Sequence, residues 1–303
     1  MPVWPEAPAP ARIRFVRTLV PATARGRGSV FGRLWNTITG GGDAPVIEQP
    51  YGLCVAAGRL FVADTAAGLL HQFDLDRSGY RAIAVRGESL IGVAAIGDRL
   101  FVTDSAGPAV IALDFKGHEL WRRGAKYGIG RPTGIAATPD GTLLVVDTLR
   151  NRVVPVTTDG GVGEAFGSQG TGPGEFNYPT NIAVDARGTV YVTDTMNFRV
   201  QILDRRGRPL GSFGRLGDGS GDFNKAKGIA LDSDGHVYVV EGLHDVVQIF
   251  DVRGTYLLGF GESGAGNGQL WLPTGLAIWH DRIFVADSAN HRVQEFDYVK
   301  ETR

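Results

Sequence analysis

Six segments of the chain repeat one pattern, in which two short apolar runs flank a polar turn and the second run ends in an acidic residue. In chain order the segments read GLCVAAGRLFVAD, GVAAIGDRLFVTD, GIAATPDGTLLVVD, NIAVDARGTVYVTD, GIALDSDGHVYVVE and GLAIWHDRIFVAD. The acidic residues are Asp64, Asp104, Asp147, Asp194, Glu241 and Asp287. They follow one another at intervals of 40 to 47 residues. A period of this length indicates an array of similar structural units.

Each unit contains further apolar runs after the acidic residue. The third run is clearest in LLHQFDL, RVVPVT, RVQIL and VVQIF, and the fourth ends in an aromatic residue and glycine in GEAFG, PLGSFG and YLLGFG. Such runs, rich in Val, Ile, Phe and Tyr and bounded by Gly and Asp, are typical of β-strands. Six units of four strands predict an all-β, six-bladed β-propeller. The blades are expected near residues 50–85, 90–123, 131–167, 178–214, 225–261 and 272–297.

The two ends of the chain are expected to close the ring. The sixth unit stops after its third strand, whereas RIRFVRTLV, at residues 12–20, has the composition of a strand and no partner of its own. We therefore expect residues 12–20 to form the outer strand of the sixth blade, which makes residues 12–303 a single propeller. Residues 1–11 contain four prolines and are expected to form an extended tether.

A polar turn follows the acidic residue and recurs as DTLRNRV, DTMNFRV and DSANHRV. A catalytic group is needed once, so an arrangement that occurs three times at one repeat position indicates a structural role. Asp194 is expected to accept backbone N–H groups, Asn197 to adopt the left-handed conformation, and Arg199 to bridge to a carboxylate. The same interpretation covers Asp64, Asp104, Asp147, Arg152, Asp287, Asn290 and Arg292.

The segment NIAVDARGTVYVTDTMNFRVQIL, at residues 181–203, resembles the NHL repeat. The resemblance extends over residues 12–297 and is strongest in the last four units, since the first two lack the Asn-x-Arg element. It implies a six-bladed propeller. It implies function less tightly, because NHL propellers bind proteins, peptides or RNA and a minority are enzymes.

The mouth of the central channel is the first place to look for a binding site. The residues that begin the inner strands there are Tyr51, Ile91, Thr133, Thr180, Lys227 and Thr274. The related calcium-dependent lactonase propellers carry Asn and Asp at these places, and threonines are poor calcium ligands without carboxylates nearby. The amidating-lyase propellers hold zinc through histidines, but the six histidines here fall at scattered repeat positions. No metal site is therefore predicted.

The fifth unit departs from the repeat. Glu241 replaces the usual Asp, His244 replaces Asn, and the segment that holds Lys225 and Lys227 stands where other units have Pro-Thr-Gly. Such a departure marks a candidate site for a ligand or partner, while ordinary sequence drift, compensated by a Lys227–Glu241 ion pair, is the other interpretation. The candidate channel-mouth residues are Tyr51, Thr133, Thr180, Asn181, Lys225, Lys227, Glu241, His244 and Thr274.

The segment before the first blade, residues 21–49, is longer than a plain loop requires. Within it, Phe31, Leu34, Trp35 and Ile38 fall on one face of a short helix that Ser29 can cap. A helix of about ten residues is not stable alone in water, so it must dock on something. Docking on the propeller itself, on a partner protein and on a membrane surface all remain open.

Composition limits the choice of partner. The net charge is −1 and no apolar run is long enough to span a membrane, and one cysteine, Cys54, excludes a disulfide framework. An RNA-binding face would be basic and lined by aromatic residues, but among the channel-mouth positions only Lys227 is basic and only Tyr51 is aromatic. No nucleic-acid partner is favoured.

The sequence as a whole predicts a non-catalytic scaffold that binds another protein or peptide and needs no cofactor. A hydrolase or lyase that uses one divalent metal near Glu241 and His244 is the alternative, and an RNA-binding propeller is third. The Pro-rich start resembles that of exported bacterial NHL lipoproteins, which suggests a periplasmic or envelope location, with a lost lipid anchor as the only link to a membrane. A cytoplasmic location is the alternative.

Overall fold

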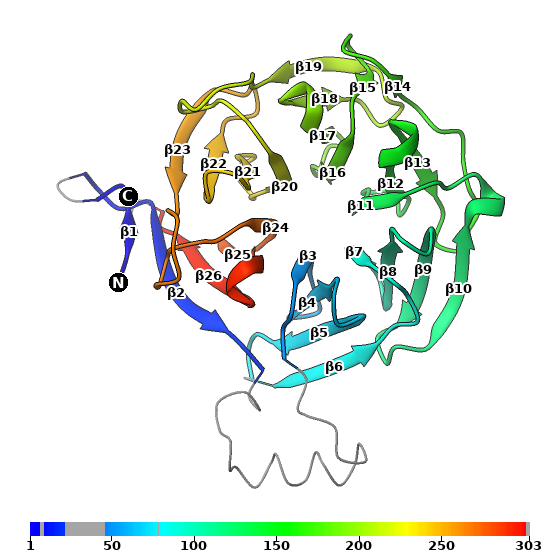
Figure 1. Ribbon diagram of the computed structural model, residues 1–303, viewed down its shortest axis with the longest axis horizontal. Helices are drawn as coiled ribbons and strands as arrows, with labels where there is room; N and C mark the ends of the chain where they lie inside the picture. Colours follow the sequence, from blue (N-terminus) through cyan, green and yellow to red (C-terminus); the bar gives the residue numbers. More distant parts are fainter. Residues whose placement is uncertain (7–8, 22–45, 78, 301–303) are drawn as a thin grey trace, which may run out of the picture.

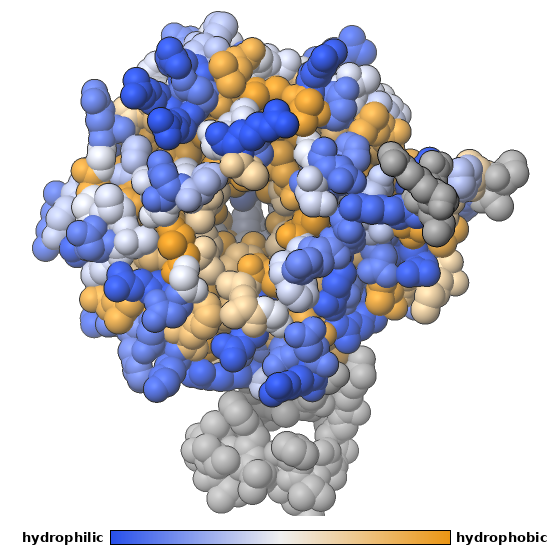
Figure 2. All heavy atoms as spheres, turned by 180° about the vertical axis from the view of Figure 1, so that it is seen from behind, coloured by the Kyte–Doolittle hydropathy of each residue, from blue (hydrophilic) through white to orange (hydrophobic). Residues whose placement is uncertain are grey.

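The computed structural model describes residues 1–6, 9–21, 46–77 and 79–300. It confirms the predicted all-β fold, because six antiparallel sheets are arranged as blades around a central opening (Figure 1). The inner strands are β3 (Pro50–Ala56), β7 (Leu90–Ile96), β11 (Pro132–Ala137), β16 (Pro179–Val184), β20 (Ala226–Leu231) and β24 (Pro273–Trp279). Seen from the opposite side, the ring again shows a central opening, with hydrophilic residues gathered on the outer parts of the face (Figure 2).

Each inner strand is followed by strands that lie progressively farther from the axis. The second strands are β4 (Arg59–Asp64), β8 (Arg99–Asp104), β12 (Leu143–Asp147), β17 (Val190–Asp194), β21 (Val237–Glu241) and β25 (Arg282–Asp287). The third strands are β5 (Leu69–Asp74), β9 (Ala109–Asp114), β13 (Arg152–Val156), β18 (Arg199–Leu203), β22 (Val246–Phe250) and β26 (Arg292–Tyr298). The outer strands of blades 1, 2, 4 and 5 are β6 (Tyr80–Ala84), β10 (Glu119–Gly124), β19 (Pro209–Phe213) and β23 (Tyr256–Phe260).

Blade 3 differs at its outer edge. Its fourth position is reduced to two isolated bridges, Val153 with Phe166 and Val156 with Val162. The loop that follows holds a two-residue parallel pair, β14 (Ser168–Gln169) with β15 (Glu175–Phe176).

In the described residues the helical segments are four 3-10 turns, η2 (Ala125–Tyr127), η3 (Thr148–Arg150), η4 (Thr195–Asn197) and η5 (Ser288–Asn290). No helix in these residues has the length and apolar character that crossing a membrane requires. The predicted helix with Phe31, Leu34, Trp35 and Ile38 lies outside the described residues.

The ring closes as the sequence predicts. Strand β2 (Ile13–Leu19) pairs antiparallel with β26 and forms the fourth strand of blade 6, with Phe15 opposite Phe296. Ile13, Phe15 and Leu19 are buried in this blade. Figure 1 shows the two ends of the chain side by side here, β2 in blue and β26 in red.

The segment before β2 is not a free tether throughout. Strand β1 (Val3–Trp4) pairs with β2 and adds a fifth strand to blade 6. The Trp4 ring packs against Phe260 and Phe296, with centroid distances of 5.9 and 5.8 Å. The prolines predicted an extended segment. The extended backbone of β1 pairs with β2, and the Trp4 ring anchors it on blade 6.

The core lies between neighbouring blades. Each of six apolar clusters joins two adjacent blades, for example Val146 of blade 3 with Val192 of blade 4. The second strand of every blade is therefore buried on both faces, which is why these strands read as continuous apolar runs.

Candidate functional site

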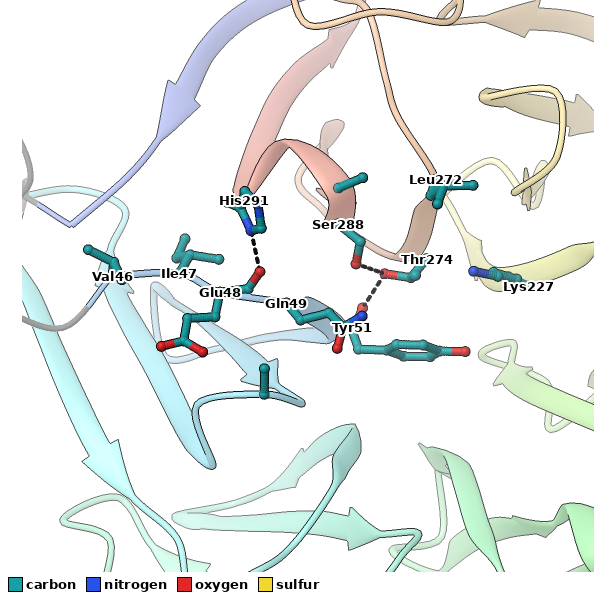
Figure 3. A pocket seen from close by; sticks show the side chains of 12 residues that line it. Val46, Ile47, Glu48, Gln49, Tyr51, Lys227, Leu272, Thr274, Ser288 and His291 are labelled. Atoms are coloured by element: carbon teal, nitrogen blue, oxygen red, sulfur yellow. Dashed lines mark hydrogen bonds between the residues drawn. The ribbon is translucent and has the colours of Figure 1, made fainter.

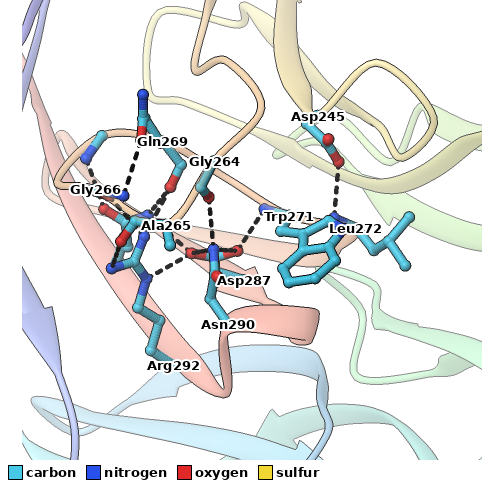
Figure 4. Close-up of polar contacts among 12 residues, drawn as sticks. Asp245, Gly264, Ala265, Gly266, Gln269, Trp271, Leu272, Asp287, Asn290 and Arg292 are labelled. Carbon is cyan, nitrogen blue, oxygen red and sulfur yellow. Dashed lines mark hydrogen bonds and ion pairs between the residues drawn. The ribbon is translucent and has the colours of Figure 1, made fainter.

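The repeated acidic residue organises the end of each blade where the inner strand begins. In blade 6, the Asp287 carboxylate accepts the backbone N–H of Trp271 at 2.7 Å and the Nδ2 of Asn290 at 2.9 Å (Figure 4). Arg292 Nε lies 2.6 Å from the same carboxylate, and its guanidinium also reaches the carbonyl of Gln269 at 2.9 Å. This network ties the turn, the third strand and the preceding loop together.

Blade 4 has the same geometry, with Asn197 Nδ2 and Arg199 Nε at 2.8 and 2.9 Å from the Asp194 carboxylate. One detail of the sequence interpretation is wrong. The left-handed residue is Phe198, with φ of 55°, and not Asn197. The reason is that Asn197 is the last residue of η4, so the chain reverses one residue later.

All six acidic residues are buried and each accepts backbone N–H groups of the loop before its inner strand. Arg152 stands in the corresponding place in blade 3, with Nε 3.5 Å from the Asp147 carboxylate. In blade 1, His71 replaces the glutamine of later units and lies 3.0 Å from Asp64 through Nε2 and 2.8 Å from the Tyr80 hydroxyl through Nδ1. Buried carboxylates with these hydrogen bonds and ion pairs stabilise the fold.

Hydroxyl groups next to these acids join one blade to the next. The donors and carbonyl acceptors are Thr65 to Leu90, Thr148 to Pro179, Thr195 to Ala226, and Ser288 to Pro50. No such bond joins blade 2 or blade 5 to the next blade, since Ser105 Oγ donates to Ser89 Oγ within blade 2 and Gly242 stands at the hydroxyl position of blade 5. The Asp245 carboxylate instead accepts the N–H of Leu272 in blade 6 at 2.7 Å.

The three channel-mouth threonines are engaged within the protein. Thr133 donates to the Thr180 carbonyl at 2.9 Å, and Thr274 donates to the Pro50 carbonyl at 3.0 Å. The Thr180 hydroxyl lies 2.8 Å from that of Thr195. The Thr133 and Thr274 hydroxyls therefore connect neighbouring blades, whereas the Thr180 hydroxyl bonds within blade 4.

A pocket of about 660 Å³ lies over the channel mouth where blades 5, 6 and 1 meet (Figure 3). It brings together Tyr51, Lys227 and Thr274, which the sequence singled out. Its lining also includes Glu48 and His291, which sequence reasoning did not select. Glu48 belongs to the loop before the first inner strand, and only the curvature of the ring brings this loop to His291, whose Nδ1 contacts the Glu48 carbonyl.

Lys227 reaches the channel across Gly242. A Cβ on Gly242 would lie 3.0 Å from the Cδ of Lys227, so the missing side chain makes room for the lysine. The ammonium lies 5.8 Å from the centre of the Tyr51 ring, within the range of a cation–π interaction. Among the described residues no carboxylate forms an ion pair with it, so the expected Lys227–Glu241 pair is not formed.

The Glu241 oxygens accept the backbone N–H groups of Asn224, Lys225 and Leu243. His244 points away from the pocket, with Nε2 3.2 Å from the Asp218 carboxylate. Within the described ranges, no cluster of three or more His, Cys, Asp or Glu side chains is arranged to hold a metal ion.

Asn181 is unusual within the inner ring. The other five blades have glycine at this position, and in each of them a Cβ would come within 2.7 Å of the next blade. The sequence forms these positions from Gly52, Gly92, Gly134, Gly228 and Gly275. Asn181 alone carries a side chain here, and its Nδ2 is buried without a hydrogen-bond partner.

Because burying the charged Lys227 side chain destabilises the folded protein, we expect Lys227→Met to raise the free energy of unfolding. Burial, followed by the nearby Lys225, lowers the pKa of Lys227 from 10.5 to about 8. The unfolded chain therefore binds the Lys227 proton more tightly than the folded chain does. This difference lowers the free energy of unfolding, with its full effect below pH 8. The pKa shift of Lys227 corresponds to a destabilisation of about 3 kcal/mol. Because the side chain is partly exposed, we expect Lys227→Met to raise the free energy of unfolding by about 1–2 kcal/mol at pH 7.

The check is urea unfolding of the parent and of Lys227→Met between pH 7 and pH 10. The gain should shrink as the pH rises from 8 towards 10.5, because the penalty disappears once both states are neutral. Lys225→Met, at an exposed lysine two residues away, is the control and should change little. A Lys227→Met protein less stable than the parent at pH 7 would contradict the argument.

Exposed apolar side chains stand around the channel mouth in blades 3 to 6. Leu149, Met196 and Leu243 occupy the same place in the turn after the second strand, whereas blades 6, 1 and 2 have alanine there. We call these three, together with Tyr178, Trp271 and Leu272 of the loops before the inner strands, the apolar rim. The sequence contained this signal, an apolar residue two places after the acid, but the repeat alignment alone did not show that it is exposed.

Comparisons with known proteins agree with this architecture. The NHL repeat family matches residues 176–203 and 270–296. No curated protein matches the sequence.

Solved structures share the fold at low sequence identity. A catalytically inactive virginiamycin B lyase from Staphylococcus aureus, crystallised with quinupristin, is 15% identical, covers 84% of this chain and 97% of its own, and has a TM-score of 0.63. A calcium-binding regucalcin from Agrobacterium tumefaciens is 17% identical over 83% of this chain and 90% of its own (TM-score 0.62). A luciferin-regenerating enzyme is 12% identical over 83% and 92% (TM-score 0.64). The repeats, the ring closure and these likenesses together make the chain a six-bladed β-propeller with NHL repeats.

Proposed function

We propose that this propeller is a non-catalytic binding module that holds a peptide segment of another protein on its channel-mouth face. The observation that carries the proposal is the apolar rim beside the 660 Å³ pocket. Apolar patches of this kind on a soluble surface are typical of protein-binding sites. Exposed apolar residues recur at one repeat position in three successive blades, so they lie on one face of the ring.

Charge on this face limits the chemistry of the occupant. Lys225, Lys227 and Arg131 all lie near the channel mouth, whereas Glu48 is the acidic residue in the pocket lining. The carboxylates of Glu241 and Asp245, which face Lys227, already accept hydrogen bonds from the protein. An apolar segment with a negative group therefore fits this face better than a basic ligand.

The same contacts favour binding over catalysis. The alternative hydrolase or lyase would use Glu241 and His244 to hold a metal, but Glu241 is committed to backbone N–H groups and His244 to Asp218. The lyase named among the solved structures supports the fold only, because it is 15% identical.

The test is a peptide selected from a displayed random library on the purified propeller, followed by affinity measurements with two leucine variants. Leu243 of the apolar rim and Leu210 of the outer strand β19 are 58% and 63% exposed, so they form a matched pair. We expect Leu243→Asp to weaken binding about tenfold or more, the equivalent of about 1.4 kcal/mol. Leu210→Asp should leave the affinity within about a factor of two, since a distant exposed site contributes little.

Two outcomes oppose the proposal. Equal losses of peptide affinity in both leucine variants, with unchanged melting temperatures, would show that the peptide does not bind on this face. About one equivalent of a bound divalent metal by elemental analysis, with a melting temperature that EDTA lowers, would favour the metal-dependent enzyme and make Glu241 and His244 the next residues to replace.

A further inference from the structure

Four arginines gather in two neighbouring turns of blade 4. Arg187 lies in the turn between β16 and β17, and Arg205, Arg206 and Arg208 lie in the turn between β18 and β19. The turns are neighbours because β17 pairs with both β16 and β18. Together they line a hollow of about 270 Å³. It lies on the face opposite to the channel mouth, since antiparallel strands place these turns and the starts of the inner strands at opposite ends of a blade.

Three of the four guanidinium groups have no partner. Arg208 Nε lies 2.6 Å from the Asp204 carboxylate. The side chains of Arg187, Arg205 and Arg206 form no ion pair or hydrogen bond among the residues that the structure describes. Four arginines and one aspartate line the hollow, which gives it a net charge of +3, and a guanidinium keeps its charge at any ordinary pH.

The nearby carboxylates are held by their own turns. Asp204 uses its second oxygen to accept two backbone N–H groups, both at 2.9 Å. Asp185 Oδ1 likewise accepts two backbone N–H groups, at 2.9 and 2.7 Å. Hydrogen bonds within the turn of Asp140, in blade 3, and to a smaller extent the charge of Arg205 lower the pKa of Asp140. None of these acids forms an ion pair with one of the three unpaired arginines.

The arginine cluster is specific to blade 4. The repeat position of Arg187 is occupied by Asp140 in blade 3 and by Asp234 in blade 5. The positions of Arg205 and Arg208 carry neither arginine nor lysine in blades 2, 3 and 5. These blades form the same turns, closed by the same backbone hydrogen bond from the turn glycine. The fold therefore does not require the arginines, and a local departure of this kind marks a candidate site.

We propose that Arg187, Arg205 and Arg206 form a binding site for a single phosphate group. A guanidinium donates two parallel hydrogen bonds to phosphate oxygens, and the three terminal oxygens of a phosphate monoester can accept from several arginines at once. The site lies on the other face from the proposed peptide-binding surface and does not depend on it.

The surroundings favour one compact phosphate over an extended polyanion. The turns of blades 3 and 5 on this face carry Asp140, Asp159 and Asp234. A nucleic acid or an anionic membrane that extends beyond blade 4 would therefore meet negative charge on both sides. The hollow, at about 270 Å³, is also smaller than the roughly 300–1,000 Å³ of sites for drug-sized ligands. A phosphorylated side chain of a partner and inorganic phosphate both present the group that fits.

The test is a ³¹P NMR titration of the full chain with inorganic phosphate and with N-acetyl-phosphoserine amide. Arg187→Asp installs the residue that blades 3 and 5 have in this turn, and Arg206→Asp installs the one that blade 3 has in the other, so neither variant threatens the fold. Arg253→Asp is the matched control, because Arg253 is an exposed arginine at the position of Arg206 in blade 5.

We expect both probes to bind saturably, and Arg187→Asp and Arg206→Asp each to weaken binding at least about tenfold. Each variant removes charge-assisted hydrogen bonds and adds repulsion. Arg253→Asp should leave the affinity within about a factor of two at an ionic strength of about 0.15 M, where the Debye length is about 8 Å. Tighter binding of the phosphoserine derivative would identify a phosphorylated partner as the source, and equal binding would identify free phosphate.

The proposal is overturned if neither probe binds saturably, or if Arg253→Asp weakens binding as much as Arg206→Asp does. Tight binding of a short single-stranded DNA that all three variants weaken alike would also overturn it, because a diffuse polyanion surface would then replace the single site. Leu243→Asp, on the channel-mouth face, should leave phosphate binding unchanged, so failure of this site and failure of the proposed function are separable.

Discussion

Removal of residues 1–20 is expected to abolish the stable ring. This deletion takes away β2, whose Ile13, Phe15 and Leu19 side chains are buried in blade 6. Full burial of such side chains is worth about 1.5–3 kcal/mol each, and a domain is stable by only about 5–15 kcal/mol in all. The deletion also uncovers the Glu295 carboxylate, which Arg17 pairs with at 2.7 Å.

Thermal unfolding followed by circular dichroism measures this effect. Phe15→Ala provides a milder version and should cost about 3–5 kcal/mol. Arg14→Ala, at the next residue with a half-exposed side chain paired to Asp297, is the control and should cost less than about 1 kcal/mol. A deletion protein that melts at the temperature of the parent would show that β2 does not close the ring in solution.

The second large effect is expected at His71. Replacement by alanine leaves a cavity in blade 1 and removes the hydrogen bonds to Asp64 and to the Tyr80 hydroxyl. We expect His71→Ala to cost about 3–4 kcal/mol. His71→Gln should cost only about 1 kcal/mol, because the same repeat position carries glutamine in blade 4, where Gln201 Nε2 donates to Asp194 at 3.2 Å.

Acid unfolding gives a second measurement on these variants. Burial alone would raise the pKa of Asp64, but the hydrogen bonds from His71 and from backbone N–H groups outweigh it and bring the pKa to about 2. The stability that Asp64 contributes is therefore complete above its ordinary pKa of 3.8 and is lost as the pH falls towards 2. His71→Ala should unfold at a higher pH than the parent, and a midpoint equal to that of the parent would contradict the assigned role of His71.

Local chemistry explains why the fold was predictable. The acidic residue of each unit sits opposite the first residue of the inner strand, as Asp147 does opposite Pro132. That pairing is repeated from blade to blade, so it leaves a period in the sequence. The closing strand was predictable for a related reason, since a sixth unit with three strands leaves an edge that residues 12–20 complete.

The turn was less completely predictable. Asp194, Asn197 and Arg199 do form one network, but the residue with positive φ is Phe198. An aromatic residue is a poor choice for that conformation on propensity alone. The chain reverses one residue later than the sequence pattern indicated, because η4 extends through Asn197, whose Nδ2 donates to the Asp194 carboxylate.

The sequence by itself determined the six blades, their strand order and the use of the N-terminal strand in blade 6, because every unit repeats the same local sequence pattern. It also showed that Lys227 departs from the repeat. Only the tertiary structure decided that Lys227 and Tyr51 meet at one pocket and that the Glu241 carboxylate bonds to backbone N–H groups rather than to Lys227. Tyr51 and Lys227 are 176 residues apart in the chain, and their proximity follows from the curvature of a closed ring, which no local pattern encodes.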